Sequence, residues 1–385
     1  KCEGKWRKAK IQKNFKLVKK EMSELIKIVR EEGKFLSEVY ECSKYDALLK
    51  CYENSFSTKQ IEVYFEDLKN FINQKYDIIV NNQIGSKCVK INISEKEQFE
   101  LSKFFMKKLG FDFKRGRLDM SAHPFCGGSI GDVRITTRIN SNNNFSAFEA
   151  VMHETGHALY EQNLPKNWSH QPAGKSGGMA LHESQSLFIE MQIMKSKEFI
   201  TYLTKVLNQK FLNHKSKINF NDLYNTLNKV EKSFIRVEAD EVTYPLHVIL
   251  RFNIEKQIIE NGIGTEELPD LWNSEFMKIF GMEIKDDSDG CLQDIHWYVG
   301  LFGYFPTYTL GAMISAQFAH QFRKDIKNLD KFINVGDFKI INKWLKKNIH
   351  QKASFFSTNE ILKMITGKSL DLNYFTKYLQ QKYIS

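Results

Sequence analysis

The pentapeptide His153-Glu154-Thr155-Gly156-His157 constrains this chain more than any other feature of its sequence. Two histidines four residues apart lie on one face of an α-helix with the glutamate beside them. Zinc hydrolases use this arrangement to hold a metal ion and to move the proton of its water. The pattern therefore predicts a helix with a metal site on one face. The alternative is a surface helix with two incidental histidines.

The residues around this motif predict the helix itself. Segment 144–160 carries apolar side chains that can cover one face, contains several alanines and has no proline, and Leu164-Pro165 should end it. Gly156 in mid-helix costs up to ~1 kcal/mol relative to alanine. We therefore expect another part of the chain to approach the backbone closely at this glycine.

A catalytic zinc needs a third protein ligand, and Glu183 is the best candidate. It lies in segment 177–186, where a glycine pair precedes an apolar-periodic helix that can run antiparallel to the first. Glu161 and Glu190 are the competitors. His182 points about 100 degrees away from Glu183 on a helix, which predicts a supporting or structural role for it.

Composition limits the fold and the compartment. The 385 residues are 42% hydrophobic and include only six prolines, which favours a large core and a mostly helical architecture. The six cysteines are scattered without a CxxC pair, so we expect reduced thiols in a cytoplasmic protein and no zinc ribbon. No apolar run reaches ~18 residues and no signal peptide opens the chain, which indicates neither a membrane span nor secretion.

The net charge of +10 raises the question of a nucleic-acid partner. Most of the excess is lysine dispersed among other polar residues, and no nucleic-acid-binding motif accompanies it. We expect a solvated basic surface and no nucleic acid.

Two stretches before the metal motif differ from the helical remainder. Residues 132–139 alternate and are rich in β-branched side chains, which predicts a strand. Residues 123–128 contain a proline and two glycines and are predicted to form a loop.

Several separate motifs together resemble one family, the M32 metallocarboxypeptidases. The blocks, in the order of that family, are HPF at 123–125, DVRITTR at 132–138, HETGHALYEQNLP at 153–165, HESQS at 182–186, EADEVTYPLH at 238–247, and DIHW with GYFPTYTLG at 294–311. The resemblance covers the whole chain. It begins some way inside a typical member, so the N-terminal helices of the family are expected to be missing.

The resemblance implies a mostly helical, saddle-like fold with a deep active-site groove. It also implies a homodimer that releases single residues from peptide C-termini with broad specificity. We expect one catalytic domain over 1–385, with 1–110 as a helical wall and 111–385 carrying the metal site and the substrate groove.

Carried onto this sequence, the family pattern makes His153, His157 and Glu183 the ligands of one divalent ion and Glu154 the general base. This agrees with the interpretation from spacing. Zinc is the expected ion, with cobalt or manganese as alternatives.

Residues of the later blocks supply candidates for the remaining chemistry. His296, Tyr304 and Tyr308 carry N–H or O–H groups that can stabilise a tetrahedral oxyanion. The free C-terminal carboxylate of a substrate suits a guanidinium, for which Arg251 is the first choice and Arg138 the second.

Three more residues complete the predicted substrate-binding set. Tyr244 and His247 would share a helical face with Arg251, and His123 lies in the HPF block. For any isolated Tyr, His or Arg in a helical protein, core packing or a surface salt bridge is the more common explanation.

Two other functions remain open. The same ligand set serves zinc endopeptidases and aminopeptidases, because it does not encode which peptide end is bound. A metal-binding remnant of a carboxypeptidase without turnover is the second alternative.

Overall fold

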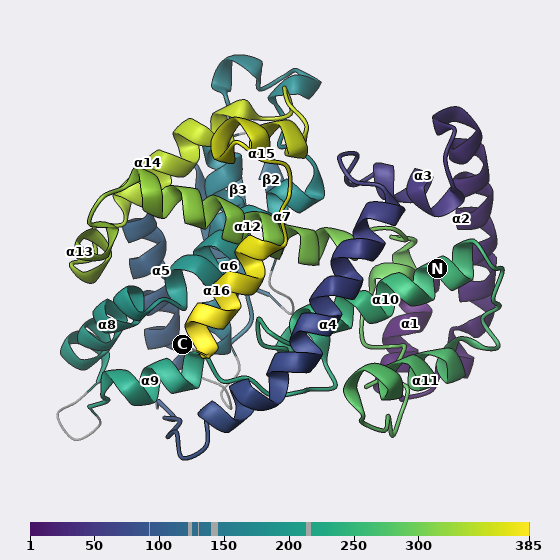
Figure 1. The fold of residues 1–385 in the computed structure, drawn as a ribbon, viewed down its shortest axis with the longest axis horizontal. Helices are drawn as coiled ribbons and strands as arrows, with labels where there is room; N and C mark the ends of the chain where they lie inside the picture. Colours follow the sequence, from purple (N-terminus) through teal and green to yellow (C-terminus); the bar gives the residue numbers. More distant parts are fainter. Residues whose placement is uncertain (92, 122–124, 130, 140–144, 213–216, 385) are drawn as a thin grey trace. The chain divides into compact units, whose positions relative to one another are not determined.

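The computed structural model describes two compact units. The described residues are 1–385 without 92, 122–124, 130, 140–144, 213–216 and 385. Unit 1 consists of 1–80 with 230–310, and unit 2 of 81–229 with 311–385. Both are mainly helical, and the described residues contain one sheet of three strands (Figure 1). The predicted mostly α fold class with a small β element is confirmed. That 1–385 act as a single catalytic domain stays a prediction.

The helices divide between the units as follows. Unit 1 holds α1 (Cys2–Ile11), α2 (Lys19–Tyr40), α3 (Lys44–Lys50), most of α4 (Thr58–Asn82), α10 (Tyr244–Ile259) and α11 (Leu268–Phe280). Unit 2 holds α5 (Glu95–Leu109), α6 (Ser146–Asn163), α7 (Met179–Leu187), α8 (Lys197–Val206), α9 (Phe220–Leu227), α13 (Leu329–Asn334), α14 (Lys339–Asn348), α15 (Thr358–Thr366) and α16 (Asn373–Tyr383). Helix α12 (Pro306–Asp325) begins in unit 1 and ends in unit 2. Among the described residues, no helix has both the length and the apolar character that a membrane span requires.

The sheet of unit 2 packs against α6. Its strands are β1 (Gly116–Met120), β2 (Phe125–Ser129) and β3 (Asp132–Thr137), in the order β1-β3-β2. Strand β3 pairs parallel with β1 and antiparallel with β2. Its buried side chains alternate along the strand and meet α6, which confirms the strand predicted there.

The prediction of a loop over 123–128 is wrong from residue 125 onward. Phe125 begins β2, an edge strand that pairs with β3 in spite of Gly127 and Gly128. Glycine weakens a strand but is tolerated at an edge, where backbone pairing supplies the order that side chains do not. His123 and Pro124 lie outside the described residues.

Unit 2 is built around α6. This helix contacts α5, α7, α14 and β3, so it is surrounded by structure on several sides. Phe105 of α5 packs edge-on against Phe148 of α6, with ring centroids 5.4 Å apart. The chain leaves α7 through a π-helical segment, η4 (Phe188–Met194), that continues along α6.

Unit 1 is built around α10, whose apolar residues are buried all round as expected for a central helix. It also buries a carboxylate. Glu255 accepts hydrogen bonds from Tyr45 Oη at 2.6 Å, Trp297 Nε1 at 2.8 Å and Gly303 N at 3.1 Å. Burial nevertheless raises the pKa of Glu255 to about 7, because the three hydrogen bonds only partly compensate for lost hydration.

This pKa predicts how stability depends on pH. The folded protein holds the Glu255 proton more tightly than the unfolded chain does, so the free energy of unfolding should fall as pH rises from about 4.5 to 7. A shift of this size corresponds to on the order of 3 kcal/mol. Urea unfolding at pH 5 and pH 8 measures it, with Glu255→Gln as the control that lacks the titration. An equal pH dependence in the two proteins would contradict the prediction.

Candidate metal centre

Helix α6 presents the two histidines of the HExxH motif together. The helix spans Ser146–Asn163 and ends at Leu164, as predicted. The rings of His153 and His157 lie one turn apart on one face, with centroids 5.1 Å apart, and both are partly buried. The helical interpretation of the motif is confirmed.

Helix α7 brings Glu183 to both imidazoles. Its Oε1 lies 3.8 Å from His153 Nε2, and its Oε2 lies 3.3 Å from His157 Nε2. Ligand atoms around a tetrahedral ion with bonds of ~2.1 Å are separated by roughly 3.4 Å, so these separations fit one metal ion. In the described part of the chain, these three residues are the group of His, Cys, Asp and Glu whose ligand atoms gather this closely.

One carboxylate oxygen of this group makes no hydrogen bond within the described part of the protein. Glu183 is 5% exposed, and its Oε1 has no hydrogen-bond partner among the described residues. A buried carboxylate oxygen without a donor is costly, and a cation is the group that would satisfy it. The donor set therefore suits a divalent ion.

The competing carboxylates support the histidines from behind. Glu190, on η4, contacts His153 Nδ1 at 2.7 Å. Glu161 contacts His182 Nε2 at 2.8 Å, and His182 Nδ1 contacts Nδ1 of His157 at 2.7 Å. Glu190 thus contacts the ring nitrogen of His153 opposite to the one that faces Glu183, whereas Glu161 reaches the corresponding nitrogen of His157 only through His182.

The charges of the site favour a cation. Burial works against the ionised form of Glu183, yet His153 and His157 keep its pKa below the usual value. Burial also opposes a charge on His153, but Glu183 and Glu190 outweigh it and raise its pKa to about 10. Burial, with His182 and His153 nearby, lowers the pKa of His157.

Two glycines allow Glu183 to reach this position. A Cβ on Gly156 would lie 2.5 Å from Ser186 Cα and closer still to the Gln185 carbonyl oxygen, so α6 and α7 touch backbone to backbone there. A Cβ on Gly311 of α12 would lie 2.7 Å from Cγ of Glu183. The close approach that the sequence predicted at Gly156 is confirmed.

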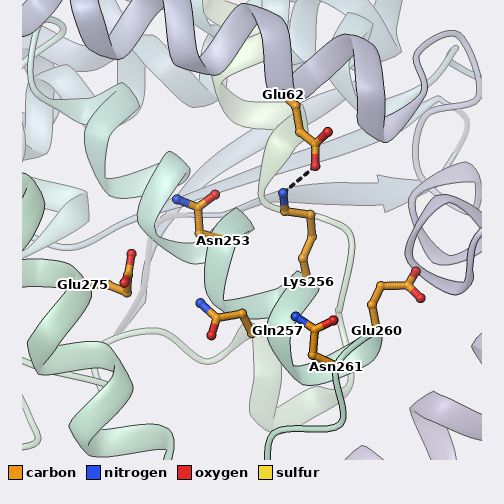
Figure 2. A pocket seen from close by; sticks show the side chains of 7 residues that line it. All are labelled: Glu62, Asn253, Lys256, Gln257, Glu260, Asn261 and Glu275. Carbon is orange, nitrogen blue, oxygen red and sulfur yellow. Dashed lines mark hydrogen bonds and ion pairs between the residues drawn. The ribbon is translucent and has the colours of Figure 1, made fainter.

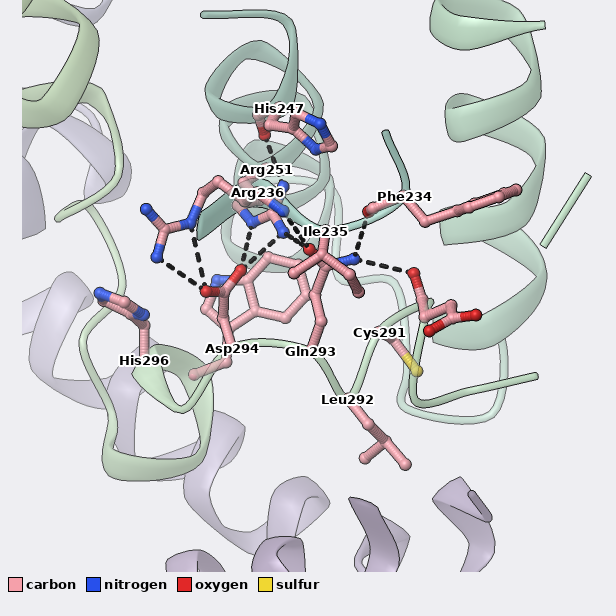
Figure 3. Close-up of polar contacts among 12 residues, drawn as sticks. Phe234, Ile235, Arg236, His247, Arg251, Cys291, Leu292, Gln293, Asp294 and His296 are labelled. Carbon is pink, nitrogen blue, oxygen red and sulfur yellow. Dashed lines mark hydrogen bonds and ion pairs between the residues drawn. The ribbon is translucent and has the colours of Figure 1, made fainter. Parts of the chain in front are cut away.

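The predicted substrate arginine Arg251 is fully buried in unit 1. Figure 3 shows it among its polar contacts. Its guanidinium contacts Asp294 Oδ2 through Nε at 2.7 Å and donates to the His247 carbonyl and to Gln293 Oε1, each at 2.7 Å. Arg236 binds the other oxygen of Asp294 at 2.8 Å. Because internal acceptors already engage every nitrogen of Arg251, this arrangement does not support its role in gripping a substrate carboxylate.

Unit 1 buries two arginines against one acid. Burial opposes ionisation of Asp294, but Arg236 and Arg251 hold its pKa far below the ordinary value. Sequence reasoning missed Arg236, which lies in a three-residue 3-10 turn without any periodic signal, and assigned no role to Asp294. Only the contact between these two distant segments in the folded protein shows that Arg236 and Asp294 form an ion pair.

His247 is also a poor candidate for substrate binding. Its ring is fully buried and packs on Phe280, with centroids 4.4 Å apart. Burial, with Arg251 nearby, lowers its pKa well below the usual value, which makes it a neutral core residue. Tyr244 is engaged too, because its hydroxyl accepts from Arg236 Nη1 at 2.7 Å.

The three predicted oxyanion donors do gather within unit 1. His296 Nε2 lies 2.8 Å from the Tyr308 hydroxyl, and the His296 and Tyr304 rings are 5.7 Å apart. Burial, helped by Arg236 and opposed by Asp294, lowers the pKa of His296 to about 4, so the ring is neutral at pH 7. Their action on an oxyanion stays a prediction.

Of the other two predicted substrate-binding residues, Arg138 belongs to unit 2. Arg138 follows β3 and is exposed, and no ion pair or hydrogen bond of its side chain is found among the described residues. His123 lies outside the described residues.

A separate pocket of about 420 Å³ lies in unit 1, where α10 meets residues of α4 and α11 (Figure 2). Its lining is entirely polar and includes the ion pair between Lys256 and Glu62, with Nζ and Oε1 2.6 Å apart. None of the predicted catalytic, metal-binding or substrate-binding residues lines it, so it is distinct from the metal centre.

Comparison with known proteins points to one family. Residues 1–383 match the family model described as Carboxypeptidase Taq (M32) metallopeptidase. The chain is 36% identical over 387 residues to Carboxypeptidase 1 of Bacillus subtilis, covering 100% of this chain and 77% of that protein. Thermostable carboxypeptidase 1 of Pyrococcus furiosus is 35% identical, with coverages of 98% and 76%. The structure of Trypanosoma cruzi metallocarboxypeptidase 1 superposes with a TM-score of 0.95 at 35% identity, covering 100% of this chain and 78% of that chain.

The close approach at Gly156 predicts the effect of a single methyl group. Gly156→Ala should push α7 away from α6, lower the free energy of unfolding by roughly 1 to 3 kcal/mol and weaken metal binding, because Glu183 moves with α7. Urea unfolding and metal titration measure the two effects.

The matched control is Gly4→Ala in α1, where nothing lies within 4 Å of the added Cβ. Alanine should there raise stability by up to ~1 kcal/mol and leave metal binding unchanged. A Gly156→Ala protein as stable as the wild type, with unchanged metal affinity, would show that the helices are not held at this distance.

Proposed function

This chain belongs to the M32 family of metallocarboxypeptidases, and we propose that it releases single residues from peptide C-termini with Glu154 as the general base. The observation that carries the proposal is the convergence of His153, His157 and Glu183, on a helix in which Glu154 directly follows His153. As a member of this family the protein is a metal-dependent carboxypeptidase. The base, the identity of the metal and the breadth of specificity are the proposed parts.

His153, His157 and Glu183 would hold a divalent ion, which would supply a Lewis acid to polarise the scissile carbonyl and lower the pKa of water. Glu154 follows His153 on α6 and is half-buried. We assign to it the transfer of the proton from water to the leaving amine. Burial, reinforced by Glu154 and Glu161, raises the pKa of the Cys126 thiol far above its ordinary value, which disfavours this cysteine as a thiolate ligand or nucleophile.

Recognition of the substrate carboxylate is better assigned to Arg138 than to Arg251. Arg138 lies in the unit of the metal ligands, and the Thr137 hydroxyl before it donates to the Ala147 carbonyl in the first turn of α6. Ala147 precedes Glu154 by seven residues, or about 10 Å of helix rise, a span that a guanidinium and one substrate residue can cover together. An exposed guanidinium is available for a bidentate contact, whereas that of Arg251 is not.

The remaining predictions complete the proposal. Zinc is the proposed ion, the specificity is broad, and the protein is a cytoplasmic homodimer. All six cysteines are free thiols, which supports a reducing compartment. Endopeptidase or aminopeptidase action is the competing activity, because the metal ligands do not select a peptide end.

Glu154→Gln tests the base. The amide is nearly isosteric but cannot accept the proton of water, so turnover should fall by several orders of magnitude while one metal ion per chain remains bound. Metal analysis and peptide hydrolysis on the same sample measure both. Turnover near the wild-type level would remove Glu154 from this role.

Paired peptides test end recognition. The wild type should cleave a free-acid peptide and leave its C-terminal amide intact, because the amide lacks the charge that a guanidinium binds. Arg138→Ala should lower kcat/KM for the free acid by a factor corresponding to roughly 2 to 4 kcal/mol, with metal content unchanged.

Arg251→Ala is the comparison variant. It should mainly lower the free energy of unfolding, because it leaves Asp294 with one partner. Equal cleavage of the amide by the wild type would favour an endopeptidase or aminopeptidase. Normal kcat/KM in Arg138→Ala, combined with a loss in stable Arg251→Ala, would return the role to Arg251.

A further inference from the structure

The two histidine ligands are supported differently. His153 Nδ1 contacts the carboxylate of Glu190 directly at 2.7 Å. His157 Nδ1 contacts another imidazole, that of His182, at 2.7 Å, and only His182 reaches a carboxylate, Glu161, at 2.8 Å. His153 therefore contacts a carboxylate directly, whereas His157 is linked to a carboxylate only through the imidazole of His182.

The direction of each hydrogen bond between His157, His182 and Glu161 follows from the proposed metal site. A metal ion at Nε2 of His157 requires the lone pair there, so the ring proton is on Nδ1. Nδ1 of His157 then donates to Nδ1 of His182, which must be unprotonated to accept. The proton of His182 is therefore on Nε2 and is donated to Oε1 of Glu161. Each bond thus fixes the tautomer required by the next.

The geometry of the helices holds this relay, the series of hydrogen bonds from His157 through His182 to Glu161, in place. On α6, His157 and Glu161 are four residues apart and share a face, and His182 in the second turn of α7 spans the two. The His182 side chain is 16% exposed, and its ring lies 5.3 Å from that of Tyr160. With its ring confined in this way, His182 contacts its two partners in one orientation.

The other proposed ligand, His153, is supported by a directly contacting carboxylate with a lysine beside it, and not by a series of hydrogen bonds. Lys195 Nζ lies 3.8 Å from Glu190 Oε1 and 3.6 Å from Glu149 Oε1, so a cation partly compensates the acid behind His153. No such cation is found near Glu161 among the described residues, where the acid is partly exposed to water. The two supports therefore differ in length and in charge.

We propose that His182 is a positioning residue for the metal centre: it fixes the tautomer and orientation of His157 through a hydrogen-bond relay that ends at Glu161, and it thereby sets the affinity and the dissociation rate of the metal. This inference rests on the proposed ligand set, because His157 must offer Nε2 to the ion. Groups that orient ligating histidines typically change metal affinity by about 10- to 100-fold when removed.

Zinc affinity, measured by competition with a chelator of known affinity, tests the relay. His182→Leu removes both nitrogens and should weaken zinc binding by about 10- to 100-fold and speed dissociation. His182→Gln restores one acceptor and one donor and should recover most of this loss. Glu161→Gln keeps the side-chain shape but removes the charge, and it should give a smaller loss in the same direction.

His350→Leu is the matched control. His350 is a buried histidine that joins the same two helices through Asn163 and Gln185, both at 3.0 Å, but it contacts no proposed ligand. The His350→Leu substitution should leave zinc affinity within about threefold of the wild-type value.

Each outcome decides the proposal. Unchanged zinc affinity in His182→Leu, or equal losses in the two leucine variants without recovery in His182→Gln, would overturn the relay. If His182→Leu does not fold, unchanged zinc affinity in Glu161→Gln overturns it instead. A wild-type protein that binds no zinc, cobalt or manganese would refute the proposed metal site itself, which separates that failure from failure of the relay.

Discussion

The contact between α6 and α7 at Gly156 is the constraint on which the site depends. Because this glycine has no side chain, the backbone of α7 at Gln185 and Ser186 can approach α6 more closely than any other residue would allow. At this separation of the two helices, the Glu183 side chain is long enough for its carboxylate to reach the imidazoles of His153 and His157. Gly311 leaves room on the other side of the same carboxylate. The proposed metal centre thus depends on backbone packing, which brings its three side chains together.

The same helix contact orders a longer line of polar groups. On α6, Glu149, His153, His157 and Glu161 follow one another at intervals of four residues, and groups from 182 to 195 face them in antiparallel order. Buried charges are expensive unless they are paired, and here each acid has a histidine or a lysine as its partner. The three proposed ligands occupy the middle of this line.

The sequence was sufficient to bring the three proposed ligands together, because the relevant spacings are local. HExxH fixes two side chains on one helical turn, and the glycine pair before Met179 marks the start of the helix that carries Glu183. Even the close approach at Gly156 could be predicted, since an unexplained glycine in mid-helix needs a reason. Local periodicity also identified β3.

Other predictions failed or lacked support because they depended on tertiary pairing. Arg251 was chosen for its residue type, but Asp294 and Gln293, more than forty residues later in the chain, already engage it. Strand β2 was mistaken for a loop because its order comes from pairing with β3 and not from its own residues. The Arg236 contact with Asp294 has no signature within either segment.

X-ray absorption at the zinc edge, on protein loaded with one equivalent of zinc, tests the central claim most directly. We expect a shell of nitrogen and oxygen atoms at ~2.0–2.2 Å in which two imidazoles contribute the outer scattering. A third imidazole would make His182 a ligand in place of Glu183. A sulfur atom at ~2.3 Å would place Cys126 or another cysteine on the metal, and either result would contradict the site derived from α6 and α7.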